Sequence, residues 1–600
     1  MATRFVSERN IRFTLFEFLD VTDLTRFPYY QSHAKKTFDM IIDAAMKLSK
    51  NLLHPIFEEM DRHPPELVDG HVRVHPQVKK IMKEAGDGGW IASIFPYDLD
   101  GEQLPWSIAG MCMHIFNAAN YSASVYPDLT KGAANLIASF GSDQQKKTYM
   151  PRLLNGEWQG TMALTEPEAG SGLADITTMA CPQDDGTYSI KGQKVFISAG
   201  DHDGVDNVIH LMLAKIQGAP AGVKGISLFI VPKKRIRPDG GLESNDVTVS
   251  QIFHKMGYRG CPITQLVMGE KNDCVGFLVG EPNKGLFYMF QMMNESRLGV
   301  GLAAASIATA AYHASLAYTR QRRQGRRPDQ KDPETPMIPI IEHADVKRML
   351  LFQRAVTEGS VALIMQCYKY ADLMIADPEN RETYHLLLEM LTPVAKTYPS
   401  EMACQAVSMG LQCLGGYGYC DDFSLEQHYR DTRIHPIHEG TTTIQGMDIL
   451  GRKVIMAKGK AFGLFTEEVT RTIGEASEID GLNRMAQDLD DALAELKRVT
   501  LGLTERAKTK GAEIFLADAT LYLEMFSHVA LGWIWLAQAL IAEGALAKTL
   551  SDSETNFYQG KLFTCRYFFS YELPKNLGLA KRLMDSDMVT VKMKPGFFTD

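Results

Sequence analysis

The spacing of apolar residues changes twice along this chain of 600 residues, and no single type of secondary structure fits all of it. Residues 31–160 repeat apolar side chains every three or four positions, which is typical of amphipathic helices. From 161 to 285 the apolar runs are short, rich in β-branched residues and bounded by glycine, aspartate and proline, which predicts strands. After 286 the helical spacing returns. Separate blocks of helix and strand indicate an α+β multidomain protein rather than a doubly wound sheet.

A chain of this length exceeds one compact core, because domains average about 100–200 residues. We expect an N-terminal helical domain with an N-terminal extension over 1–160, a middle β domain over 161–285, a helical bundle over 286–465 and an additional helical domain over 466–600. Within the β domain, the letters "KGQK" at 191–194 predict a hairpin turn.

Charge and composition exclude several classes of protein. Lysine plus arginine number 63 and aspartate plus glutamate 72, so the formal charge of −9 argues against nucleic-acid binding, which needs a basic face. The nine cysteines form no CxxC pair, which favours reduced thiols in the cytoplasm and gives no support to a metal site. We expect no secretory signal and no membrane span, since the late apolar stretch 529–537 is shorter than the roughly 20 residues a bilayer requires.

Four short motifs carry more specific information, namely "MALTEPEAGSGLADITT" (162–178), "KVFISAG" (194–200), "LGGYGY" (414–419) and "YRDTRIHPIHEGTTTIQ" (429–445). In this order and spacing they resemble the acyl-CoA dehydrogenases over roughly residues 40–460. The resemblance implies the fold of that family: an N-terminal helical domain, a middle β-barrel-like domain and a C-terminal helical bundle, here with an extra C-terminal helical domain. Three further features resemble the bacterial subgroup that contains the 3-methylthiopropanoyl-CoA dehydrogenases. They are the length of the chain with its extra C-terminal helices, and the letters "ISAGDHD" and "HKMGYRGCP".

The family oxidises a fatty acyl thioester to a trans-2-enoyl-CoA, and this chemistry needs a base for the weakly acidic α proton. Glu439 matches the catalytic base of the family. An ordinary glutamate is a weak base, but desolvation beside cofactor and substrate would raise its proton affinity. Some branches of the family place the base at the position of Ser296, and a serine cannot serve there. Glu295 should point elsewhere on the helix and is expected to be paired or solvated.

The resemblance assigns further residues to the substrate and to FAD, which accepts the hydride. Arg297 and Gly440 are expected to lie next to the substrate and base. The residues expected to contact the isoalloxazine ring and the pyrophosphate are Thr165, Ser171, Phe196, Ser198 and Thr441. Those expected at the ADP half of FAD are Arg322, Gln324, Gln412, Gly415 and Gly416. In the family this last group comes from a neighbouring subunit, which implies a homodimer or a larger homo-oligomer.

The sequence departs from the common family pattern at Glu168, Gly172 and Thr443. These departures affect the expected loop contacts to cofactor and CoA rather than the expected fold.

Rival functions remain open at this level. The first expectation is a dehydrogenase of fatty acid β-oxidation that passes electrons to an electron-transfer flavoprotein. An acyl-CoA oxidase that uses O₂, a nucleic-acid-binding flavoprotein of the same superfamily and an inactive scaffold are the alternatives. Residues 466–600 carry no dominant basic stripe, which argues against the nucleic-acid alternative. Methylthiopropanoyl, short, branched and aryl acyl groups are all compatible with the sequence, as are a dimer and a tetramer.

Overall fold

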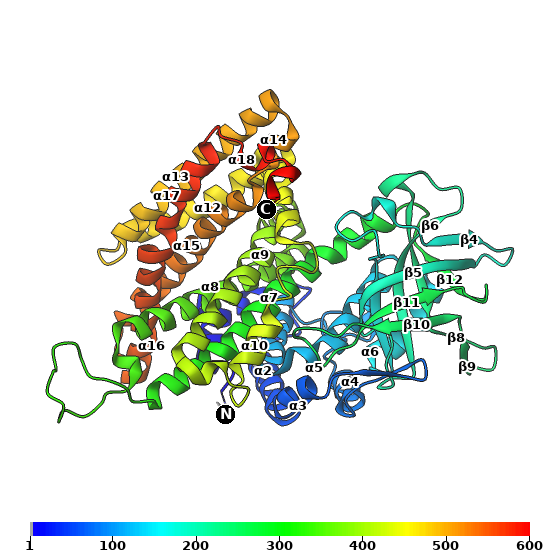
Figure 1. Cartoon of the computed structure of the whole chain (residues 1–600), viewed down its shortest axis with the longest axis horizontal. Helices are drawn as coiled ribbons and strands as arrows, with labels where there is room; N and C mark the ends of the chain where they lie inside the picture. The colour runs from blue at the N-terminus through cyan, green and yellow to red at the C-terminus, as the bar shows by residue number, and fades with distance from the viewer. Residues whose placement is uncertain (1–3, 600) are drawn as a thin grey trace. The chain divides into compact units, whose positions relative to one another are not determined.

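The computed structural model describes residues 4–599, apart from the side chains of 290–293, and it divides into two compact units. The sheet unit comprises Lys36–Ser296, and the helical unit comprises the described residues of Met1–Lys35 and Arg297–Asp600. Figure 1 shows the strands gathered in the sheet unit and long helices in the other. The block predicted over 1–160 is therefore shared between the two units.

The sheet unit begins with helices and a small hairpin. Its helices are α2 (Lys35–Leu48), α3 (Phe57–Arg62), α4 (Gln77–Asp87), α5 (Trp106–Phe140) and α6 (Asp143–Leu154), and β1 (Glu66–Val68) pairs with β2 (His71–Arg73). The "GSD" letters end one helix and begin the next, because the Ser142 side chain caps α6 and Gln145 completes a capping box.

A kink interrupts α5 at Asn120, whose backbone is extended (φ −168°, ψ 98°). The Asn120 side chain satisfies two backbone groups there: its Nδ2 donates to the carbonyl of Leu53 at 3.1 Å, and its Oδ1 accepts from the amide of Ala123 at 3.1 Å. Helices kink where a side chain replaces part of their backbone ladder. The amphipathic spacing of the segment gave no sign of this break.

The main sheet is mixed and has eight strands. Its strands are β3 (Trp158–Ala163), β4 (Met179–Pro182), β5 (Tyr188–Ser198), β6 (Asn207–Ile216), β7 (Ile226–Pro232), β10 (Val247–Ile252), β11 (Ile263–Met268) and β12 (Val275–Val279); β8 (Lys234–Ile236) and β9 (Leu242–Ser244) form a separate pair. The pairing path runs from β5 through β12, β7, β6 and β4 back to β5, so these five strands enclose a small core. The middle domain is therefore barrel-like, as predicted.

The hairpin turn predicted at 191–194 is wrong, because β5 runs straight through these letters. The strand changes partners instead: residues up to Lys191 pair with β4 and β12, and residues from Gly192 onward pair with β11. A Cβ on Gly192 would lie 2.5 Å from the Thr178 hydroxyl, so glycine is needed for the close approach of the chains.

Aliphatic and aromatic side chains fill the interior of the sheet. The buried members of this core are Ala163, Ala180, Ile190, Ile197, Met212, Ala214, Phe229, Val231, Val247, Leu266, Met268 and Cys274. They come from strands that lie up to about a hundred residues apart in the chain, which fixes the register of the sheet.

The helical unit contains two groups of helices. Its helices are α1 (Glu8–Arg12), α7 (Gly285–Gln321, which begins in the sheet unit), α8 (Ala344–Ala376), α9 (Arg381–Leu414), α10 (Leu425–Thr432), α11 (Thr442–Asp448), α12 (Lys460–Ser477), α13 (Asn483–Lys510), α14 (Ala512–Leu516), α15 (Ala519–Leu546), α16 (Asp552–Tyr567), α17 (Asn576–Met584) and α18 (Val589–Lys592). α8 and α9 pack along one another, and α12, α13, α15 and α17 lie side by side at the upper left of Figure 1.

The C-terminal helices share a core with the bundle rather than standing apart. Trp535 on α15 is fully buried, and its Nε1 donates to the carbonyl of Ala355 on α8 at 3.1 Å. The buried Lys561 on α16 pairs with Glu358 on α8 at 2.8 Å. The N-terminal segment joins the same region, since Arg9 pairs with Glu554 at 2.8 Å.

Two helices, α7 and α15, are long and apolar enough to cross a bilayer by length and composition alone. In the part of the chain that the structure describes, 78% and 61% of their most apolar windows are buried in protein, as in core helices. The argument from the short apolar stretch 529–537 needs correction, because that stretch lies within a helix of 28 residues.

Candidate active site

Glu439 lies in the loop between α10 and α11, and its backbone is strained. Its φ of 52° is in the left-handed region, and Gly440 follows with a φ of 87°. A residue with a Cβ adopts this region at a cost of about 1–2 kcal/mol, and such strain gathers at functional sites. Gln445 donates to the carbonyls of both residues, at 3.3 and 3.5 Å, and the Thr441 side chain caps α11.

The charges around the Glu439 carboxylate act in opposite directions. Burial raises the pKa of Glu439 above its ordinary value, while the cations Arg297 and Lys396 oppose that rise. Arg297, on α7, forms an ion pair with Asp448 at 3.2 Å, and these side chains are 3% and 8% exposed. Lys396, on α9, is fully buried and donates to the carbonyl of His435 at 2.8 Å. The site thus holds a carboxylate whose affinity for a proton is raised.

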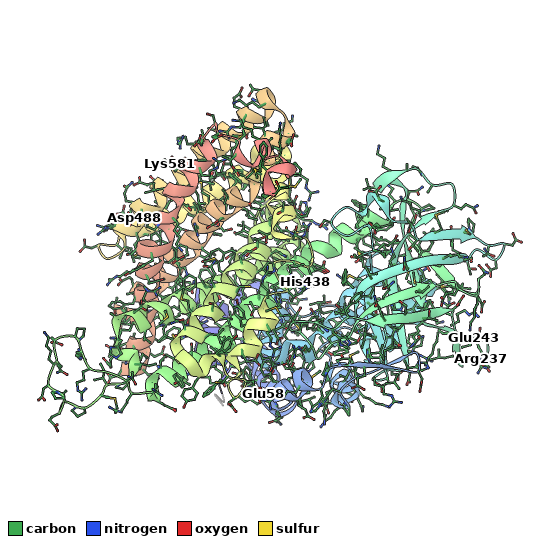
Figure 2. All side chains as sticks on the ribbon, in the orientation of Figure 1. Glu58, Arg237, Glu243, His438, Asp488 and Lys581 are labelled. Carbon is green, nitrogen blue, oxygen red and sulfur yellow. The ribbon has the colours of Figure 1, made fainter. Side chains whose placement is uncertain are left out.

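Two histidines precede Glu439 in the same loop. Figure 2 labels His438, and its ring lies 5.2 Å from that of His435 in an edge-to-face arrangement. Burial lowers the pKa of His435 to about 4 and that of His438 well below its ordinary value. Both rings are therefore neutral at pH 7, and the cationic charge near Glu439 comes from Arg297 and Lys396.

The rival position for a base holds no proton acceptor. Ser296 lies half-buried on α7. Its neighbour Glu295 accepts a hydrogen bond from Asn135 at 2.7 Å, and burial raises the pKa of Glu295 to about 7. Of the two outcomes expected for Glu295, paired or solvated, the structure shows a hydrogen-bond partner. Its raised pKa was not predicted, because burial of this side chain is not visible in the sequence.

Phe196 interrupts the regular pairing of β5 in the sheet unit. The register between β5 and β11 shifts here, and Phe196 has a φ of 60°, which marks a β-bulge that redirects the side chain. Its ring is 61% exposed and rests on Phe253 with the ring centroids 4.8 Å apart. Thr165 adjoins this bulge, since its carbonyl accepts from the Val195 amide at 2.9 Å. Ser198, two residues further along β5, is half-buried.

A buried ion pair that the sequence analysis missed supports this region. Glu166 and Lys194 lie 2.8 Å apart with side-chain exposures of 3% and 0%. The Glu166 carboxylate also accepts from the amides of Thr177 and Thr178, at 2.6 and 3.1 Å. Burial alone would raise the pKa of Glu166, but Lys194 and these hydrogen bonds lower it to about 2. The loop that carries Ser171 is thereby tied to β5. The signal available in the sequence was a lysine placed directly before the apolar run 195–197 of the predicted strand.

The residues assigned to the ADP half lie at the ends of two helices of the helical unit. Arg322 and Gln324 follow the end of α7, and Gln412 lies in the last turn of α9; all three are exposed. The two helix ends converge on one apolar cluster that includes Tyr318, Phe423 and Leu414. The structure thus brings these assigned residues to a common surface.

The glycines at the end of α9 leave open space. Gly415 has a φ of 61°, and a Cβ at Gly415 or Gly416 would meet no atom within 4 Å. Exposed guanidinium groups and unhindered backbone are each suited to the oxygens of a diphosphate.

The assigned residues therefore form three groups. Thr165, Phe196 and Ser198 adjoin one another at the bulge in the sheet unit, and Ser171 lies exposed on the loop after β3. Glu439, Gly440, Thr441 and Arg297 form the second group, and the ends of α7 and α9 form the third. Assembly of the first group with the others into one flavin site stays a prediction.

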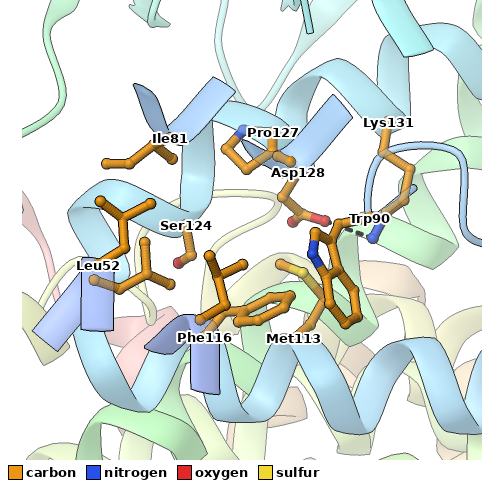
Figure 3. Close-up of a pocket in the computed structure, with 12 residues that line it drawn as sticks. Leu52, Ile81, Trp90, Met113, Phe116, Ser124, Pro127, Asp128 and Lys131 are labelled. Carbon is orange, nitrogen blue, oxygen red and sulfur yellow. Dashed lines mark ion pairs between the residues drawn. The ribbon is translucent and has the colours of Figure 1, made fainter. Parts of the chain in front are cut away.

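An apolar cavity lies among the helices of the sheet unit (Figure 3). It is lined by Leu48, Leu52, Leu53, Ile81, Ala85, Trp90, Met113, Phe116, Ser124, Pro127, Asp128 and Lys131. The Trp90 and Phe116 rings meet edge to face at 5.1 Å, and Asp128 and Lys131 form an ion pair of 2.8 Å on one side. This cavity is not visible in the sequence, because residues from four separate segments line it.

Comparison with known proteins establishes the family. The four matching family profiles are the acyl-CoA dehydrogenase N-terminal domain (residues 35–157), middle domain (161–270) and C-terminal domain (283–454), and the acetyl-CoA dehydrogenase C-terminal-like domain (465–594). The chain belongs to the acyl-CoA dehydrogenase family, whose members are oxidoreductases that act on CH–CH bonds. The extra helices predicted over 466–600 correspond to a recognised domain of this family.

Two sequence relatives are similar over nearly their whole length. The 3-methylmercaptopropionyl-CoA dehydrogenase of Ruegeria pomeroyi is 37% identical over 541 residues, which cover 89% of this chain and 90% of the relative. A butyryl-CoA dehydrogenase of Syntrophomonas wolfei is 34% identical over 603 residues, which cover 98% of this chain and 97% of the relative.

Two solved structures share the fold. Caenorhabditis elegans ACDH-11 in complex with C11-CoA has a TM-score of 0.75 at 20% identity and covers 94% of this chain and 90% of that chain. An acyl-CoA dehydrogenase complexed with FAD from Bacillus anthracis has a TM-score of 0.60 at 22% identity, with coverages of 93% and 96%. The expected fold class is thus confirmed over almost the entire chain.

Proposed function

We propose that this protein catalyses the α,β-dehydrogenation of an acyl-CoA thioester to the trans-2-enoyl-CoA, with Glu439 as the base that abstracts the α proton. The observation that carries the proposal is the Glu439 loop: a carboxylate in left-handed backbone conformation, with its pKa raised by burial and with two cations nearby. A raised pKa brings the proton affinity of a carboxylate closer to that of the weak carbon acid.

The neighbours of Glu439 have separate roles in this proposal. Arg297 keeps part of the carboxylate population ionised, which is the form that accepts a proton. Gly440 gives the loop its second left-handed residue and lets the Gln445 side chain approach the backbone; a Cβ there would lie 2.5 Å from Nε2 of Gln445. Thr441 starts α11 and so fixes where the loop ends.

FAD is the cofactor that family membership implies, and it supplies the acceptor for the hydride that leaves Cβ. The chain's own residues fit such a group. The exposed ring of Phe196 offers a flat apolar face, and the redirected strand brings Thr165 and Ser198 beside it. Arg322 with the open backbone at Gly415 and Gly416 suits a diphosphate.

The acyl group itself is left open by this proposal. Methylthiopropanoyl, short, branched and aryl acyl groups all remain candidates.

We propose electron-transfer flavoprotein as the acceptor of the electrons. The proposed oligomer is a homodimer or a larger homo-oligomer, and the proposed location is the cytoplasm. The butyryl-CoA dehydrogenase and the methylmercaptopropionyl-CoA dehydrogenase among the relatives support a dehydrogenase over an oxidase. Peroxide release at the rate of turnover in air, without an added acceptor, would favour the oxidase.

Anaerobic titration of the FAD-loaded protein with a panel of acyl-CoAs tests the proposed reaction. Loss of the oxidised flavin absorbance, together with a 2-enoyl-CoA product two mass units lighter than the substrate, is the expected result. A protein that binds FAD yet shows neither change with any straight-chain, branched, aryl or methylthio acyl-CoA would contradict the proposal.

A further inference from the structure

Two residues of α9 contact the Glu439 loop, one on each side of the carboxylate. Before Glu439, Nζ of Lys396 donates to the carbonyl of His435 at 2.8 Å. After Glu439, the hydroxyl of Thr442 donates to Oε1 of Glu401. Lys396 and Glu401 lie five residues apart on α9, on either side of Pro399, so one helix contacts both ends of the loop.

These contacts account for a conformation that the loop residues do not favour by themselves. The φ of 52° at Glu439 persists only where the surroundings fix the backbone on either side. Lys396 is fully buried. The removal of an ammonium group from water costs free energy unless hydrogen bonds and opposite charges compensate for it. Its hydrogen bond goes to a backbone carbonyl, while Glu439 and Glu401 supply the negative charge around it.

We propose that Lys396 and Glu401 are positioning residues that hold the loop at its two ends and keep the Glu439 carboxylate in the orientation used for proton abstraction. The inference rests on the proposed function of Glu439 and extends it to α9. Lys396 also acts through its charge, because it faces the same carboxylate. The other charged and titratable groups that face Glu439 and Lys396 in the helical unit are Arg297 from α7, Glu401 from α9, and His435 and His438 from the loop.

Removal of the Lys396 charge should shift the pH profile of kcat in a definite direction. Lys396 lowers the pKa of Glu439, so its loss raises that pKa further. Glu439 must be ionised to accept a proton, and kcat therefore rises with pH through this pKa. The acid limb of the kcat profile should accordingly move to higher pH in Lys396→Met.

The test compares FAD-loaded Lys396→Met with Lys561→Met, a second fully buried lysine whose partner is Glu358. We expect Lys396→Met to lower kcat by about 10²-fold, the loss typical of a misplaced catalytic group, with a small change in KM and an acid limb at higher pH. Lys561→Met should lower thermal stability but leave the pH profile in place. Equal profiles in the two variants would overturn the role of Lys396.

Glu401 is tested by a double-mutant cycle with its partner. We expect Glu401→Leu and Thr442→Val each to lower kcat, and the double variant to lose no more than the worse single variant, because either change removes the same contact. Additive losses would contradict a shared contact. Glu439→Gln separates the two levels of the account: if it turns over normally, the proposed function fails; if it is inactive while Lys396→Met behaves like Lys561→Met, only the present inference fails.

Discussion

A carboxylate that removes a proton from carbon needs a proton affinity above that of an ordinary glutamate, and the Glu439 loop supplies it by burial rather than by a neighbouring anion. The charged groups that oppose this rise are the cations Arg297 and Lys396. The balance leaves a carboxylate whose proton affinity is raised toward that needed for a weak carbon acid. This arrangement depends on a local backbone geometry in which Gly440 and Gln445 take part.

Single residues were predicted unevenly. Glu439, Phe196 and the Gly415–Gly416 pair could be picked out by their place in motifs, and each has a distinctive conformation in the structure. The supporting residues Glu166, Lys194 and Lys396 were missed. Their importance comes from burial and from partners distant in sequence, and neither is visible in the letters around them.

The Glu166–Lys194 pair leads to a stability prediction. Replacement of Lys194 by methionine leaves a buried carboxylate with fewer partners, and we expect a loss of about 3–5 kcal/mol in the free energy of unfolding, the range for a broken buried pair. The double change Glu166→Gln with Lys194→Met should recover part of that loss. Urea titration of the three proteins measures it, and a single variant within about 0.5 kcal/mol of the parent would contradict the account.

The same pair has a pH dependence. Folding lowers the pKa of Glu166 from 4.5 to about 2, so its contribution is fully present above pH 4.5 and is lost as pH falls toward 2. The stability difference between parent and double variant should therefore shrink over this acid range.

At the scale of elements, apolar spacing predicted helices, strands and their order, because each element buries one face or one stripe. It failed at breaks that depend on distant partners. The kink of α5 needs the carbonyl of Leu53, and the partner change in β5 needs β11 on one side and β4 on the other. A local pattern cannot report which strand or loop comes close.

The cavity among α2, α4 and α5 leads to a prediction about stability. Leu48 lies half-buried at its lining, and the larger ring in Leu48→Trp would crowd the packed side chains around it. We expect a loss of about 1–3 kcal/mol in the free energy of unfolding, measured by urea titration. Met40→Trp, at an exposed position of the same helix, is the matched control and should change it by less than about 0.5 kcal/mol. Equal effects of the two substitutions would contradict the prediction.

At the scale of the whole molecule, the C-terminal helices and the bundle share one core. The sequence predicted an additional helical domain over 466–600 but not this shared core. Trp535 illustrates the sharing: it is fully buried on α15, and a Cβ on Gly359 of α8 would lie 2.6 Å from its Nε1. We expect Trp535→Ala to lower the free energy of unfolding by about 3–5 kcal/mol. Leu501→Ala, at a position 72% exposed, should change it by less than about 0.5 kcal/mol.

Hydrogen exchange tests directly whether α8 and α15 unfold together. Peptides from α8 and α15 should lose protection together in Trp535→Ala, because the side chain links the two helices. Loss of protection in α15 alone would show that the extension unfolds as a separate domain.

The central claim is that Glu439 takes the α proton, and anaerobic mixing of Glu439→Gln with an acyl-CoA that reduces the parent enzyme tests it most directly. Glutamine keeps the size of the side chain and its hydrogen-bonding capacity but accepts no proton at this step. The account predicts a variant that still binds FAD and acyl-CoA, with a flavin that remains oxidised on the timescale of parental turnover. Flavin reduction at the parental rate would contradict it.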